Sequence, residues 1–352
     1  MKIALLTPSR VLIGRFFDSS LQTLPRTRTT GPASTRDLEA MCQPYLLQGL
    51  APSTRKTYSS AQRLFINFCE MTGRVHPNVS PFPTEEWTLC LFATQLSASL
   101  QPPTIKVYLS AVRSLRIERG YADPLKDCLR LQHVVKGIKR CKGSSLDRRL
   151  PITPHILRNL FSGLNLSNFD DLMFWGACCL AFFGFLRSAQ FTLQPGTVFS
   201  SSHHLSVADV TVDRRNNPSS IQVCIKASKT DPFRNGCLIT LGRGLPPVCP
   251  VEAMLNYLEL RGGHSGPLFI YSNGRPLSRS FLTGKLRKLL DAAGITGYFG
   301  SHSFRIGAAT TAAAAGVPDH LIQVLGRSTS NAYMPYIRTP RSTLANVAKF
   351  MC

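Results

Sequence analysis

The stretch Ser301-His302-Ser303-Phe304-Arg305 places an imidazole and a guanidinium three residues apart, and Tyr336 follows further along the chain. On an α-helix, residues three apart lie on the same face, so His302 and Arg305 are predicted to project to one side. A guanidinium binds phosphate well, and a phenol that reached the same place would add a nucleophile. His-x-x-Arg also arises by chance in many helices, where its members only start a helix or fill a core. The residues that accompany this stretch therefore decide its meaning.

The chain is long and strongly basic. It has 352 residues, of which 41 are Lys or Arg and 19 are Asp or Glu, which gives a formal net charge of +22. With 43% hydrophobic residues it can build cores for two domains. Because the basic residues recur along most of the chain instead of forming one tail, nucleic acid is the favoured partner. The alternative is a soluble protein whose charge only solvates its surface.

The composition argues against several other classes of protein. Eleven cysteines, with no Cys-x-x-Cys pair and no Cys/His group at zinc spacing, predict reduced thiols, an intracellular location and no metal site. The longest apolar stretch, residues 172–186, is too short to span a bilayer, so no membrane association is expected. No cofactor and no small-molecule substrate are expected. Basic runs at 139–142 and 148–149 suit entry into the nucleus, although DNA-binding surfaces carry such runs too.

Composition and periodicity divide the chain into five parts. Residues 1–35, rich in Ser, Thr, Pro and Arg, are expected to form a mobile N-terminal arm. A helical domain is predicted over 36–142, a linker over 143–150, a second domain over 151–345 and a tail over 346–352.

Four helices are predicted in the first domain, starting near Ser53, Thr84, Thr104 and Asp123. Their outer faces carry many cations, which make a plausible clamp for double-stranded DNA; ordinary solubilising charge is the alternative. The candidate DNA-binding residues are Arg55, Lys56, Lys106, Arg113, Arg116, Lys136, Lys139 and Arg140.

The second domain is predicted to combine helices with a small antiparallel sheet. Its β-branched runs predict strands over 205–212, 221–226 and 237–241, and residues 228–236 form the turn between the second and the third strand. The predicted fold class of the chain is therefore mainly α with a small antiparallel β-sheet. Helices are predicted from Thr153 onward and over 170–186, 250–261, 278–293, 304–315 and 318–325.

Four elements, taken in order, resemble the tyrosine recombinases of the phage-integrase type. The run Ala181-Phe182-Phe183-Gly184-Phe185-Leu186-Arg187 is similar to the family's Gly-Leu-Arg box, which makes Arg187 its first arginine. The family's lysine lies on a hairpin turn, where this chain has Lys229; Lys226, at the end of the preceding strand, is the rival. The matches to the remaining elements are His302, Arg305 and Tyr336.

The resemblance covers about residues 36–345 and looks closest to recombinases of eukaryotic mobile elements, both DIRS-like and Crypton-type. The Ser-Lys-Thr-Asp-Pro-Phe-Arg turn and the runs Gly-Ala-Ala-Thr and Leu-Gly-Arg after the His-x-x-Arg carry this likeness. It implies a helical core-binding domain followed by an α+β DNA breaking-rejoining catalytic domain. It also implies a homo-tetramer assembled on two DNA duplexes.

The implied activity is site-specific DNA recombination and integration through a 3′-phosphotyrosyl intermediate. Arg187 and Arg305 would stabilise the charge that builds on the phosphate. A phenol titrates at about pH 10, so Tyr336 needs a base, for which His302 is the candidate. Lys229 would protonate the leaving 5′-oxygen. Because the phosphotyrosyl bond stores the energy of the cleaved bond, neither a metal nor ATP is needed.

Three positions depart from the family's pattern. Gln190 replaces an acidic residue, and Ser328 stands where mobile-element members have Trp. Pro335 directly precedes the nucleophile, where inside a helix it would cost about 3 kcal/mol. These departures support a first alternative, a catalytically impaired or domesticated DNA-binding protein on the same fold. A second alternative, outside the family, is a basic helical RNA-binding protein.

The interval before the nucleophile adds two candidates to the catalytic set. The family's His or Trp position, nine residues before the tyrosine, falls on Arg327 when Tyr336 is the nucleophile, and this favours Tyr336 over Tyr333. Arg327 and its neighbour Ser328 are therefore included as further candidate site residues.

Overall fold

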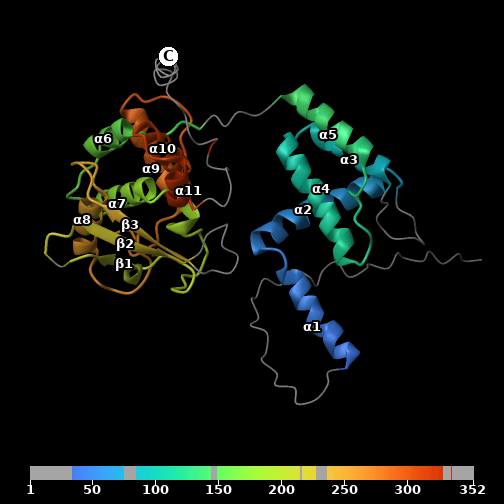
Figure 1. The fold of residues 1–352 in the computed structure, drawn as a ribbon, viewed down its shortest axis with the longest axis horizontal. Helices are drawn as coiled ribbons and strands as arrows, with labels where there is room; N and C mark the ends of the chain where they lie inside the picture. The colour runs from blue at the N-terminus through green and yellow to red at the C-terminus, as the bar shows by residue number, and fades with distance from the viewer. Residues whose placement is uncertain are drawn as a thin grey trace, which may run out of the picture. The chain divides into compact units, whose positions relative to one another are not determined.

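The computed structural model describes residues 34–74, 85–143, 149–214, 216–226, 236–327 and 334. The chain divides into two compact units, Met1–Leu146 and Asp147–Cys352. Eleven α-helices and one three-stranded antiparallel sheet make up most of the described structure (Figure 1), which confirms the predicted mainly α fold class. None of the helices within these ranges is long and apolar enough to cross a membrane.

The described part of the first unit is entirely helical. Its core contains a group of aromatic rings, in which the centroid of Phe92 lies 5.0 Å from that of Phe65 and 5.3 Å from that of Phe68. Helix α2 packs against α4, and α3 packs against α5. The helices are α1 (Thr35–Gln48), α2 (Pro52–Met71), α3 (Glu86–Ser97), α4 (Pro102–Glu118) and α5 (Leu129–Lys142).

Three features of this unit differ from the prediction. Helix α1 is additional; it starts at Ser34, whose Oγ accepts a hydrogen bond from Asp37 N at 3.2 Å while the Asp37 carboxylate accepts one from Ser34 N at 3.1 Å. Helices α2 and α4 start slightly earlier than predicted, at prolines, because proline lacks the N–H that would have no partner in a first turn. Helix α5 starts later, because the chain turns at Asp127, whose φ is +58°.

The second unit contains a small sheet, which is formed by residues from the N-terminal half of the unit, and helices around that sheet. The sheet has the order β1-β2-β3, with Val212 opposite Ile221 and Ile225 opposite Cys237. The first strand is shorter than predicted, because Val207–Asp209 forms a 3₁₀ turn before it. The elements are α6 (Pro154–Ser162), α7 (Phe169–Phe183), β1 (Val210–Val212), β2 (Ser220–Ile225), β3 (Cys237–Gly242), α8 (Pro250–Arg261), α9 (Arg279–Ala292), α10 (Ser303–Ala314) and α11 (Asp319–Leu325).

Helix α7 is the central element of the second unit. It is buried along most of its length and packs against both α8 and α10. The helix ends at Gly184, where a Cβ would lie only 2.7 Å from the Leu180 carbonyl oxygen, so a larger residue does not fit. Phe185 follows with a φ of +50° and reverses the chain. This sharp turn delivers Arg187 to the end of the helix.

The start of α10 is fixed by a close contact with the segment that precedes α6. Ile152 N donates a hydrogen bond to the Ser303 carbonyl oxygen at 3.0 Å. A Cβ at Gly307 would lie 1.8 Å from the Ile152 carbonyl oxygen, so the two backbones touch at a position that only glycine allows. The start of α10, which carries the His-x-x-Arg stretch, is therefore held against the segment before α6 through contacts between the two backbones.

Candidate functional site

The side chain of Arg187 is partly buried at the end of α7. Its backbone N–H donates to Gln190 Oε1 at 2.7 Å, which holds the turn. Its Nη1 is buried, and no described residue offers it a hydrogen-bond acceptor. A buried charged donor without an acceptor is costly, because it has lost its hydration and gained nothing in return. The turn therefore presents a guanidinium that can gain a bond from an anionic ligand.

Arg305 lies deeper, with only 1% of its surface exposed. Its Nη1 donates to the Phe185 carbonyl oxygen at 2.6 Å, and its Nη2 donates to the carbonyl oxygen of Gly326. Arg305 thus ties the ends of α7 and α11 to α10.

Arg327 completes a group of three arginines. Its backbone is left-handed, with a φ of +50°, and its Nη2 donates to the carbonyl oxygens of Gly184 and Phe185 at 2.9 and 3.1 Å. Burial lowers the pKa of the Arg327 guanidinium, and the nearby charge of Arg187 lowers it further. The two guanidiniums are therefore close enough to repel each other, and a negatively charged ligand would relieve this repulsion.

His302 is the half-buried N-cap residue of α10, and its segment lies next to the turn that carries Arg187. Its neighbour Ser301 donates from Oγ to Ser188 Oγ at 3.2 Å, and Ser188 directly follows Arg187. The structure thus brings four sequence-predicted residues together from three separate segments. They are Arg187, His302, Arg305 and Arg327.

Gln190 has a structural role that the sequence did not reveal. It is buried, and its side-chain oxygen accepts the hydrogen bond from Arg187 N. At this position, where an acidic residue was expected, a neutral side-chain oxygen therefore supports the backbone of Arg187. Sequence reasoning treated Gln190 only as a departure, because the hydrogen bond depends on a 3₁₀ turn over Ser188–Gln190 that has no clear sequence signal.

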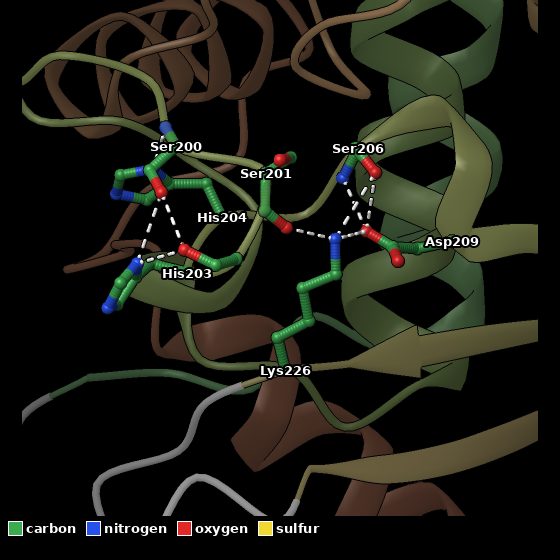
Figure 2. Close-up of polar contacts among 8 residues, drawn as sticks. Ser200, Ser201, His203, His204, Ser206, Asp209 and Lys226 are labelled. Atoms are coloured by element: carbon green, nitrogen blue, oxygen red, sulfur yellow. Dashed lines mark hydrogen bonds and ion pairs between the residues drawn. The ribbon is translucent and has the colours of Figure 1, made fainter.

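The other predicted members of the site, Lys229, Ser328 and Tyr336, lie outside the described residues, as do the rival Tyr333 and the departure Pro335. Lys226 is described, and its Nζ forms an ion pair with Asp209 Oδ2 at 2.7 Å (Figure 2). Within the described ranges, no group of three or more His, Cys, Asp or Glu side chains could hold a metal ion.

The candidate DNA-binding cations of the first unit are mostly accessible. Six of the eight are exposed, and Arg55 is half-buried. Lys106, Lys136 and Lys139 line a groove of about 560 Å³ between α4 and α5, which apolar residues such as Leu109 also line. This groove is the place in the described first unit where several predicted cations converge.

Arg116 was wrongly placed on an outer face. It is 7% exposed, and its guanidinium lies 4.4 Å from the centroid of the Tyr121 ring. It follows the buried Leu115 on the side of α4 that faces the core, and its long apolar stem can be buried there. Burial lowers its pKa. Arg113 is exposed but forms an ion pair with Asp123 at 2.6 Å, so part of its charge is compensated.

Residues 248–339 match the Phage integrase family. The chain is similar in structure to the XerH site-specific recombinase bound to palindromic difH substrate in a post-cleavage complex, with a TM-score of 0.60, 15% identity, and coverage of 90% of this chain and 85% of that one. It is also similar to a Tn1549 transposon integrase variant in complex with transposon right end DNA, with a TM-score of 0.54, 13% identity, and coverage of 86% and 95%.

A third similar structure is a lambda integrase dimer bound to a COC′ core site, with a TM-score of 0.51, 15% identity, and coverage of 87% of this chain and 77% of that one. No curated protein matches the chain. The likenesses show that the chain has the fold of these recombinases and integrases.

Proposed function

We propose that this chain is a tyrosine-type DNA recombinase that cleaves and rejoins DNA strands through a 3′-phosphotyrosyl intermediate, without a metal or ATP. The observation that carries the proposal is the buried Nη1 of Arg187, which has no acceptor among the described residues; the charge of Arg187 also lowers the pKa of the Arg327 guanidinium. A phosphodiester supplies both the acceptor and the negative charge that this arrangement needs. The match of residues 248–339 to the Phage integrase family supports the same reaction class.

The proposed reaction assigns one role to each residue. Tyr336 Oη attacks the phosphorus, its proton passes to His302, and the bond from phosphorus to the 5′-oxygen breaks. Lys229 gives a proton to that oxygen. Arg187 and Arg305 bind the non-bridging oxygens and stabilise the charge of the transition state. Because Arg305 is held by carbonyls on two segments, its guanidinium is positioned before the phosphate arrives.

The proposed partner is double-stranded DNA, which is bound by the accessible cations of the first unit. Four copies of this chain are proposed to assemble on the DNA as a homo-tetramer. The groove lined by Lys106, Lys136 and Lys139 supports contact with phosphates, because lysines on the rim of one groove can follow a charged backbone. We further propose an origin in a eukaryotic mobile element, DIRS-like or Crypton-type, and action in the nucleus.

A second candidate function is DNA binding without cleavage on the same fold. Pro335, immediately before the proposed nucleophile, favours it, because a misplacement of about 1 Å can reduce a rate 10²-fold. The neutral Gln190 in an acidic position points the same way, although it still supports the Arg187 backbone.

Covalent trapping separates the two functions. The full chain is incubated, in EDTA and without ATP, with a pool of nicked duplexes of randomised sequence, and adducts are resolved on a denaturing gel. The recombinase predicts a protein–DNA adduct whose released strand carries a free 5′-hydroxyl, detected by enzymatic labelling of that end. DNA that is retained on native gels but never forms an adduct would leave only the binding function.

A further inference from the structure

The β2–β3 hairpin has a closely packed base. Ile225 and Cys237 are the last paired residues of the two strands, and Gly236 comes just before Cys237 with a φ of +70°. A Cβ at Gly236 would lie 3.0 Å from the Ile225 carbonyl oxygen, so the backbones of the two strands are in contact at this end of the hairpin. Lys226 is the first residue beyond this paired end of β2.

The ammonium group of Lys226 is fully engaged with the protein. It forms the ion pair of 2.7 Å with Asp209 Oδ2, donates to the Ser201 carbonyl oxygen, and lies 3.4 Å from Ser206 Oγ (Figure 2). The two side chains of the ion pair are 21% and 9% exposed. An ammonium has three N–H groups, and all three are directed to protein acceptors. Lys226 is therefore poorly placed to give a proton to a substrate.

The acceptors of Lys226 are themselves held in place. Asp209 Oδ2 also accepts from Ser206 N at 2.8 Å and from Ser206 Oγ at 2.7 Å. Asp209 immediately precedes Val210, which pairs with Val223 of β2, so the carboxylate is fixed relative to the strand that Lys226 follows. Lys226 thus closes a link between β2 and the turn that precedes β1.

The loop that supplies the Ser201 carbonyl is braced by its own polar contacts. Ser200 N donates to His204 Nδ1 at 3.0 Å, and Ser200 Oγ lies 3.1 Å from His203 Nδ1 (Figure 2). These contacts bridge three and four residues and so restrict the loop on both sides of Ser201. The carbonyl that Lys226 binds therefore belongs to an ordered loop.

From these contacts we infer that Lys226 is a positioning residue, which through Asp209 fixes the end of β2 and so the start of the segment that carries Lys229. The inference rests on the proposed function, in which Lys229 is the proton donor. Lys229 is three residues from Lys226 in the sequence, so a change in direction at Lys226 is passed on to it within a short length of chain. Removal of either partner also leaves a partly buried charge uncompensated, which favours rearrangement.

A substrate that needs no proton donor tests this inference. A duplex that forms the covalent adduct is prepared with sulfur in place of the bridging 5′-oxygen. Thiols have a pKa of about 8.5, so the sulfur leaves as a thiolate without being protonated. The variants are Lys226→Met, Asp209→Asn, Lys229→Met and the double variant of the two lysines.

With the oxygen substrate, we expect Lys226→Met and Asp209→Asn to slow cleavage about 10- to 100-fold, as for a displaced catalytic group. With the sulfur substrate, both variants should cleave at nearly the rate of the unmodified chain, as should Lys229→Met. On oxygen, the double variant should be no slower than Lys229→Met, because Lys226 acts through Lys229.

A matched control separates positioning from general stability. Lys285 and Asp171 form another ion pair of comparable burial in the same unit, between α9 and α7. Lys285→Met should lower the melting temperature but leave the ratio of the oxygen to the sulfur rate unchanged. If Lys226→Met slows both substrates equally, as a destabilised fold would, the inference is wrong.

Three other outcomes would also overturn the inference. Full activity of Lys226→Met on oxygen would remove any role for the residue. Rescue by sulfur of Lys226→Met but not of Lys229→Met would make Lys226 the proton donor itself. Failure of sulfur to rescue either lysine variant would mean that no proton from this hairpin is involved. Failure of the proposed function is distinct from these outcomes, because the unmodified chain would then form no adduct with either substrate.

Discussion

Arg305 and Arg327 donate hydrogen bonds to the same carbonyl oxygen, that of Phe185, at 2.6 and 3.1 Å. Phe185 is in a left-handed conformation at the end of α7, so the two guanidiniums hold the turn that presents Arg187. The three arginines therefore have different duties. Arg305 and Arg327 stabilise the turn, whereas the Nη1 of Arg187 has no hydrogen-bond acceptor among the described residues.

This difference predicts distinct effects of two substitutions. Arg187→Ala and Arg305→Ala should each reduce adduct formation about 10²-fold or more, as for loss of a preorganised donor. Arg305→Ala should also leave the buried Gly326 carbonyl without its Arg305 donor, at about 1 to 3 kcal/mol, and the Phe185 carbonyl with Arg327 as its remaining arginine donor, which together lower the melting temperature by about 2 °C or more. Arg187→Ala should melt close to the unmodified chain. Paired measurements of melting and of single-turnover cleavage check this, and equal melting losses would contradict the division of duties.

The pH dependence of stability should reveal His204. Burial lowers the pKa of its imidazole below 6.5, and the charge of His203 contributes. The unfolded chain therefore takes up a proton at His204 at a higher pH than the folded chain does, so the free energy of unfolding should fall as the pH drops below about 6.5. Denaturant unfolding at about pH 7.5 and about pH 5.5 measures the loss, which His204→Gln should reduce. An unchanged loss in that variant would assign it to other groups.

Binding to non-specific duplex DNA should depend steeply on salt. If six or more phosphates are neutralised, the slope of log affinity against log salt should be about −5 or steeper, and Lys136→Ala or Lys139→Ala should each reduce it by about 1. Arg116→Met is the matched control, because Arg116 is buried and should not touch phosphate. A slope that falls equally for Arg116→Met would place the DNA elsewhere, and a flat dependence would assign the charge to another partner.

Much of the fold was predictable where the signals are local. Helix α8 was predicted at its observed bounds, because Pro250 opens it and Gly262, with a φ of +68°, ends it. Arg116 was misplaced because a charged side chain on an amphipathic helix looks exposed until its aromatic partner is known. The start of α5 depended on a left-handed Asp127, which no pattern of apolar residues indicates.

The candidate site was predictable as a set of residues, but its contacts were not. The order of Arg187, His302 and Arg305 along the chain identified the set. The carbonyls of Gly184 and Phe185, to which Arg305 and Arg327 donate, lie 120 or more residues away in sequence, so no local pattern could reveal these bonds. The pairing of Lys226 with Asp209 likewise depends on the register of β1 against β2.

The three departures from the family's pattern predict a chain that can be improved. Gln190→Glu keeps an oxygen for Arg187 N and adds a negative charge near the arginines, while Ser328→Trp adds an indole directly after Arg327. Pro335→Arg removes the constraint next to the nucleophile. The triple variant should give more adduct per unit time than its parent. A parent that already cleaves at full rate, or a triple variant that is no faster, would contradict the interpretation that these three residues impair the site.

The central claim is that Tyr336 forms the bond to DNA. The most direct measurement is the identity of the adduct on the nicked duplexes, by a denaturing gel and by mass spectrometry of the tryptic peptide that retains the nucleotide. Tyr336→Phe should form no adduct and should bind the duplex as tightly as the unmodified chain, while Tyr333→Phe should still form it. An adduct that persists in Tyr336→Phe and disappears in Tyr333→Phe would contradict the account.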